Sequence, residues 1–147
     1  MRIRISKGVP GVDADAAARW WGDFRDGHED HPRIPGHRRR IVAREAGSIT
    51  MEEETRLAGV RLFFERVTAW PEGREVRFAG RNNFAIFDGA YRFEPDGDGT
   101  RIVLEANVQL RRPIEWTDVA AKPLVAGILR ADLAAHATDM RRDLKGR

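Results

Sequence analysis

The chain has 147 residues, of which 41% are apolar, with a net charge of +3 and a pI of about 9.9. This size and composition predict one globular domain, residues 1–147, and exclude a disordered or fibrous chain. The absence of cysteine excludes disulfides, thiol nucleophiles and cysteine zinc sites. No apolar run approaches the ~20 residues of a membrane-spanning helix, so no integral membrane segment is expected.

A strand and a helix are the first predicted elements. Residues 2–7 alternate between apolar and polar side chains, as a strand with one buried side does. After the break at GVPGVDAD, Asp13 or Asp15 is a good N-cap. A helix is therefore expected over about residues 14–25, with an interruption near Gly22.

The stretch DGHEDHPRIPGH, residues 26–37, combines histidines and carboxylates, the side chains that bind zinc. Zinc-binding histidines on a helix stand three or four residues apart, because those positions share a face. His28 and His31 have this spacing, but Gly27 and Pro32 bracket them and disfavour a helix. We therefore expect a solvated connector, or a rim over a cavity mouth, and no metal site.

The middle of the chain, residues 37–111, has an apolar period of two, which predicts six strands joined by short turns in a meander. The first turn lies at residues 46–48, and a three-residue loop there would set Ile41 opposite Glu53. DGDG signals the last hairpin, and TRIVLEANVQLRR alternates cleanly after it. With the opening strand, the expected sheet has seven strands.

The last third of the chain has a helical period. One apolar stripe contains Val125, Ile128, Leu129, Leu133, His136, Met140 and Leu144. Pro123 belongs to the first turn of this helix or marks a kink after a shorter one. The seven-stranded sheet has one face to bury, and only this long helix can cover it. A curved sheet around a helix leaves a space wherever side chains do not meet.

This order of elements resembles the START-like superfamily of helix-grip proteins, and its polyketide cyclase/dehydrase and lipid-transport branch above all. The resemblance covers essentially the whole chain and is strongest where DGAYRFEPDGDGTRIVLEANVQL runs into LVAGILRADLAAHATDMRRDL; VPGVDADAAARWW resembles the way into the first helix. It implies an α+β fold in which a curved antiparallel sheet surrounds a long C-terminal helix. Because such proteins include carriers, receptors, cyclases and chaperone cofactors, it implies a cavity and not a reaction.

The basic charge does not predict a nucleic-acid partner. Arginine outnumbers lysine 23 to 3, but 23 acidic residues are interspersed among these bases. The densest basic run, Arg38-Arg39-Arg40, falls in a predicted strand, where neighbouring side chains point to opposite faces. The cysteine-free sequence, without a secretion signal at its start, is compatible with the cytoplasm.

Polar side chains on apolar surfaces are the candidates for a binding site. His136 lies near the centre of the apolar helix stripe, with Asp132 one turn earlier. His136 is either a hydrogen-bonded core residue or a cavity group that holds a ligand or moves a proton, in which case Asp132 could orient it.

Arg39, Glu53 and Arg66 each share an expected strand face with apolar neighbours. A buried charge costs several kcal/mol unless it is paired, so these side chains form ion pairs, contact a ligand or reveal an error in the expected register. A bulge after Phe63-Phe64 would turn Arg66 outward.

Most aromatic residues are expected in the core, and some should line the pocket, because ligand cavities are largely apolar. The candidates are Phe64, Trp70, Phe78 and Tyr91. The hydroxyl of Tyr91 is either a contact for the polar end of a ligand or that of an ordinary half-buried tyrosine.

Three classes of function stay open at this point. The first, which we expect, is binding of a small or medium hydrophobic molecule, lipid- or polyketide-like, without a cofactor. The second is a cyclase/dehydrase-type enzyme in which His136, Asp132, Arg39 or Glu53 acts as acid or base on a carbonyl compound. The third is a protein-interaction or chaperone-cofactor module with a filled core. A homodimer is compatible with all three.

Overall fold

The computed structural model describes residues 1–24, 37–111 and 118–146, and in this part of the chain two helices accompany one seven-stranded antiparallel sheet. The strands are β1 (Arg2–Val9), β2 (His37–Glu45), β3 (Ser48–Leu57), β4 (Val60–Glu72), β5 (Glu75–Asn82), β6 (Ala85–Asp96) and β7 (Gly99–Leu110). The helices are α1 (Ala14–Gly22) and α2 (Asp118–Lys145). The strand order is β1-β7-β6-β5-β4-β3-β2, so the expected meander is present and β1 pairs with its last strand. The predicted helix-grip architecture is confirmed.

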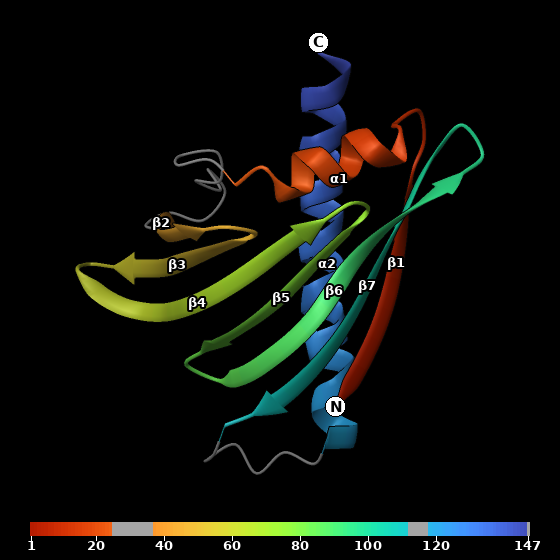
Figure 1. The fold of residues 1–147 in the computed structure, drawn as a ribbon. Helices are drawn as coiled ribbons and strands as arrows, with labels where there is room; N and C mark the ends of the chain where they lie inside the picture. The colour runs from red at the N-terminus through yellow and green to blue at the C-terminus, as the bar shows by residue number, and fades with distance from the viewer. Residues whose placement is uncertain (25–36, 112–117, 147) are drawn as a thin grey trace.

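The sheet curves around α2, and α1 crosses that helix towards its C-terminal end (Figure 1). Helix α2 packs most closely on β1 and α1, while α1 also contacts β5, β6 and β7. The largest fully buried apolar side chains are Phe93, Ile102, Leu104, Leu133 and Met140. In β2, β3 and β4, by contrast, Met51 and Ala69 are the buried residues. The core therefore lies on the β1–β7–β6 side, and the inner face of the other strands is less completely covered.

Two glycines on the inner face allow adjacent strands to approach closely. A Cβ atom at Gly89 would lie 2.2 Å from the carbonyl oxygen of Glu105, and one at Gly80 would lie 2.6 Å from that of Arg66. Glycine inside a strand commonly marks such a close backbone approach. These positions contribute to the curvature that lets the sheet surround α2.

The β2–β3 hairpin differs from the expected register. Its turn consists of two residues, Ala46 and Gly47, and Gly47 has a positive φ of 82°, a left-handed conformation that glycine adopts without steric cost. An irregularity between Ile41 and Ala43 then shifts the pairing. As a result Ile41 lies opposite Met51, not opposite Glu53 as predicted.

Strand β4 also contains an irregularity, near the β3–β4 turn. Thr55 pairs with Phe63 but Arg56 pairs with Arg61, which leaves Leu62 as the additional residue. Beyond it, the face of β4 that carries the buried Ala69 consists of the odd-numbered residues. The even-numbered residues therefore face outward.

The two helices follow the expected pattern with three differences. The Asp13 side chain accepts a hydrogen bond from the N–H of Ala16 at 2.9 Å and caps α1, which ends at Gly22. Pro123 lies inside α2 beyond its first turn. Ile128 does not belong to the buried stripe, because it is 61% exposed. Neither of these helices is long and apolar enough to cross a membrane.

Candidate functional site

A row of four polar residues crosses the inner face of the sheet. Arg39 of β2 lies opposite Glu53 of β3, Glu53 lies opposite Glu65 of β4, and Glu65 lies opposite Asn82 of β5. Because directly opposed side chains on one face of a sheet are close neighbours, these four residues interact in sequence. We call them the polar row.

At one end of the polar row is an ion pair. The guanidinium of Arg39 binds the carboxylate of Glu53, and their side chains are only 14% and 15% exposed. The His37 imidazole lies 3.5 Å from the same carboxylate through Nε2, and 3.1 Å from the Thr55 hydroxyl through Nδ1. Pairing offsets the cost of burying these charges. An internal ion pair was one of the alternatives that the sequence left open.

At the other end, Glu65 accepts a hydrogen bond of 3.0 Å from the amide Nδ2 of Asn82. The Asn82 amide is itself held in place, because its Oδ1 accepts from the backbone N–H groups of Phe84 and Ala85. Burial raises the pKa of Glu65 from 4.5 to about 7, and the negative charge of Glu53 adds to this. At neutral pH, protonated and ionised Glu65 are therefore present in comparable amounts, which suits a group that exchanges a proton.

Tyr91 stands among aromatic rings on the same inner face. Its ring centre lies 5.0 Å from that of Trp21 and 5.2 Å from that of Phe78. Burial, followed by the charges of Asp132 and Glu65, raises the pKa of Tyr91. The hydroxyl forms no hydrogen bond with the residues that the structure describes. Tyr91 is thus a neutral hydrogen-bonding group in an aromatic surrounding.

His136 faces these residues from α2. Its Nδ1 lies 3.0 Å from the Asp132 carbonyl oxygen and 3.4 Å from an oxygen of the Asp132 carboxylate. The imidazole also lies 5.5 Å from the Trp21 ring, centre to centre. Burial by itself lowers the pKa of His136, but the hydrogen bonds and the charge of Asp132 outweigh burial and raise it.

These groups are close enough to influence one another electrostatically, although the Asp132 side chain is itself 47% exposed. The charge of Asp132 raises the pKa of both Glu65 and Tyr91, and the charge of Arg39 lowers them. We define the interior polar cluster as Arg39, Glu53, Glu65, Asn82, Tyr91 and His136, with the exposed Asp132 at its rim. With the aromatic rings around it, the cluster can contact the polar end of an apolar molecule and exchange a proton at Glu65 or His136.

Three of the predicted site residues lie on the outer face instead. The Arg66 side chain is 50% exposed and lies 3.6 Å from Glu52. Phe64, like Arg66, is an even-numbered residue of β4 and lies on the same face. The Arg61 guanidinium stands 4.9 Å from the centre of the Phe64 ring. Trp70 is also an even-numbered residue of β4 and therefore lies on the outer face. The predicted inward orientation of Arg66, Phe64 and Trp70 is therefore wrong, whereas Phe78 is an inner-face residue.

Sequence reasoning missed Glu65 and Asn82. In β4, the more apolar of the two alternating sets contains Val60, Leu62, Phe64 and Trp70, and this set suggests the wrong inner face. The bulge after Phe63-Phe64 that would turn Arg66 outward was only one of the open alternatives, and the irregularity lies instead at Leu62. The signal that could have revealed Glu65 was its position on the same strand face as the apolar residues Val67 and Ala69.

The stretch DGHEDHPRIPGH, which combines histidines and carboxylates, falls almost entirely outside the described part of the chain. Residues 26–36 of the connector lie outside the described residues. Within residues 1–24, 37–111 and 118–146, no group of three or more His, Cys, Asp or Glu side chains could hold a metal ion.

The family model described as polyketide cyclase/dehydrase and lipid transport matches residues 2–141. The chain belongs to this family. Membership of the polyketide cyclase/dehydrase and lipid-transport family agrees with the helix-grip fold and leaves the individual ligand unspecified.

Solved structures share the fold over nearly the full chain. The Zhui aromatase/cyclase from Streptomyces sp. R1128 has a TM-score of 0.72 and 14% identity, covering 99% of this chain and 93% of its own. A START superfamily protein from Mycobacterium smegmatis has a TM-score of 0.67 and 14% identity, with coverages of 99% and 97%. A protein from Thermus thermophilus has a TM-score of 0.67 and 20% identity, with coverages of 97% and 95%. No curated protein matches the sequence.

Proposed function

We propose that the protein binds a small or medium hydrophobic molecule, lipid- or polyketide-like, between the inner face of the sheet and α2. The observation that carries this proposal is the incomplete burial of the inner-face aromatics Phe78, Phe87 and Tyr91. A filled interior would bury such side chains almost completely. Their partial exposure, beside the interior polar cluster, supports a space for a ligand and speaks against a solid core.

Apolar burial would provide most of the affinity, at roughly 25 cal/mol per Å² of surface removed from water. The polar end of the ligand would contact the Tyr91 hydroxyl and the Glu65 carboxyl group, which need partners in a dry site. Protonated Glu65 can donate to a carbonyl oxygen, and Tyr91 can donate or accept. These two groups would orient the bound molecule.

One end of the sheet is suited to ligand access. The β3–β4 and β5–β6 turns lie at that end, and α2 begins after β7 reaches it. In the described part of the chain, the exposed large apolar residues all lie near these turns or in the first half of α2: Leu57, Val60, Leu62, Phe84, Ile86, Leu124 and Ile128. An apolar molecule could pass along such side chains with little contact with water.

A pair of neighbouring substitutions tests the binding site. Val67→Trp would add bulk on the inner face, and Arg66→Trp would place the same side chain outside. We expect an environment-sensitive apolar dye to bind the unmodified protein saturably, to bind Val67→Trp about tenfold more weakly, and to bind Arg66→Trp normally.

Native mass spectrometry of the purified protein would identify a co-purified molecule directly. Circular dichroism should first establish that both variants fold. Equal dye binding by the two tryptophan variants would contradict an internal site, as would unsaturable binding by the parent protein.

A catalytic role of the cyclase/dehydrase kind is the second candidate, and the near-neutral pKa of Glu65 favours it. Glu65 or His136 would transfer a proton to or from a bound carbonyl compound. Glu65→Gln keeps the shape and hydrogen bonding of the side chain but removes proton exchange. Loss of turnover of a poly-β-keto substrate with retained binding would support catalysis, whereas unchanged turnover would exclude Glu65 as the acid or base.

The expected cytoplasmic location and the homodimer stay predictions. Fractionation of cells would test the first, and sedimentation analysis of the purified protein would test the second.

A further inference from the structure

A second recess lies at the edge of the sheet, where β1 runs beside α2. Its volume is about 480 Å³, within the range of roughly 300–1,000 Å³ typical of small-molecule sites. The lining residues are Arg2, Ile3, Arg4, Glu105, Lys122, Ala126 and Arg130. We call it the edge groove. It shares no residue with the interior polar cluster.

The edge groove has an excess of positive charge. Four cationic side chains line it, two from β1 and two from α2, against the single carboxylate of Glu105. Lys122 and Arg130 stand eight residues apart with Ala126 between them, a spacing that places all three on one side of the helix. Neither cation forms an ion pair with the described part of the chain.

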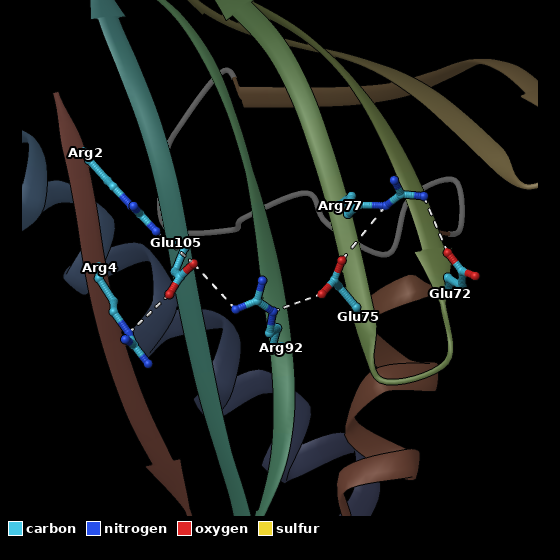
Figure 2. A network of polar contacts seen from close by, with 7 residues as sticks. All are labelled: Arg2, Arg4, Glu72, Glu75, Arg77, Arg92 and Glu105. Atoms are coloured by element: carbon cyan, nitrogen blue, oxygen red, sulfur yellow. Dashed lines mark hydrogen bonds and ion pairs between the residues drawn. The ribbon is translucent and has the colours of Figure 1, made fainter.

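Glu105 cannot neutralise these cations, because three arginines already share its carboxylate (Figure 2). Its oxygens lie 3.6 Å from Arg2, 3.3 Å from Arg4 and 3.5 Å from Arg92. When every ionisable side chain of the lining carries its full charge, the net charge of the edge groove is +3, from four cations and one carboxylate. Among the described residues, the positive charge is therefore unmatched at this edge of the sheet.

The ion-pair network around Glu105 offers the groove no further carboxylate from the described residues. Figure 2 shows the ion pairs continuing away from β1, from Arg92 to Glu75 at 2.9 Å. Glu75 also lies 4.0 Å from Arg77, which pairs with Glu72 at 3.4 Å. Each of these carboxylates is engaged with an arginine further along the outer face. An anion from outside the chain would complete the charge pattern at the groove.

We propose that the edge groove binds a phosphate group carrying more than one negative charge. Arginine and lysine together suit phosphate, since guanidinium groups form paired hydrogen bonds and the ammonium acts as a point charge. A lining charge of +3 favours a multiply charged phosphate over a single carboxylate. The group could belong to a soluble phosphorylated molecule or to a lipid headgroup. The edge groove would bind it whether or not the interior holds a hydrophobic molecule.

Calorimetry with pyrophosphate and sedimentation with vesicles distinguish these two sources. The vesicles contain phosphatidylcholine alone or phosphatidylcholine with phosphatidic acid. We expect the double variant Lys122→Gln/Arg130→Gln to weaken the binding of either probe about tenfold. Arg141→Gln, an exposed substitution on the same helix, is the charge control for the Arg130 change and should leave binding unchanged.

Glu105→Gln provides a test in the opposite direction, because it removes the only carboxylate of the groove lining and should strengthen binding. Binding of pyrophosphate with this variant pattern assigns a soluble ligand, and binding only of phosphatidic acid vesicles assigns a headgroup. The proposal is overturned if neither probe binds, or if Arg141→Gln weakens binding as much per charge as the groove substitutions. It is also overturned if Glu105→Gln weakens binding in a folded protein.

Discussion

Glu65→Gln should stabilise the protein above neutral pH and change its stability much less in acid. Glu65 is protonated in both the folded and the unfolded protein below its ordinary pKa of 4.5, so burial of the neutral side chain carries no charge penalty there. Between pH 4.5 and about 7 the unfolded chain releases this proton while the folded protein retains it. The free energy of unfolding therefore falls as pH rises through this interval.

The size of the effect follows from the same pKa. One pKa unit corresponds to about 1.4 kcal/mol, so the rise from 4.5 to about 7 corresponds to about 3 kcal/mol. Glutamine removes this penalty and can still accept the hydrogen bond of Asn82. Relative to the parent protein, Glu65→Gln should gain about 3 kcal/mol between about pH 4 and about pH 8.

Urea unfolding followed by tryptophan fluorescence measures this gain at a series of pH values. Glu94→Gln, an exposed substitution on β6, is the matched control and should change stability little at any pH. The titration of the Glu65 carboxyl carbon by NMR gives the pKa directly. A stability difference between Glu65→Gln and the parent that stays flat with pH would refute the argument, because it would mean that Glu65 is solvated.

Two further predictions concern curvature and the helix histidine. Gly89→Ala should destabilise the fold by about 3 kcal/mol, because the new Cβ would lie 2.2 Å from the Glu105 carbonyl oxygen. Gly8→Ala is the control, since a Cβ there would have no other atom within 4 Å, and it should be nearly neutral in the same urea experiment. Asp132→Asn should lower the pKa of His136 measured by NMR, since Asp132 raises it and burial lowers it. The stabilisation from this pair should be present below pH 6.5 and disappear as pH rises through the His136 pKa, and a pH-independent effect of Asp132→Asn would contradict the pairing.

Much of the fold was predictable because it depends on local periodicity. The alternation of TRIVLEANVQL, the DGDG turn and the Asp13 cap each specify structure over a few residues, and all three are present. The inward direction of Arg39 and Glu53 also followed from alternation. These features required no knowledge of distant contacts.

The inner-face positions of the other site residues depended on where the pairing of adjacent strands shifts by one residue. A tight turn at Ala46-Gly47 and an extra residue at Leu62 changed the pairing, and one residue of shift moves a side chain to the other face. For this reason Arg66 lies outside and Glu65 inside. Short-range apolar content favoured the opposite choice, because β4 exposes part of its more apolar set.

The spacing of apolar side chains along the chain encodes the order of elements, the seven strands and the covering helix, whereas the helix-grip arrangement was what the resemblance to the START-like superfamily implied. The row of Arg39, Glu53, Glu65 and Asn82 facing Tyr91 and His136 depends instead on contacts between distant parts of the chain. Four strands and α2 must come together for that, and the pKa of Glu65 depends on burial and on charges that are far away along the chain.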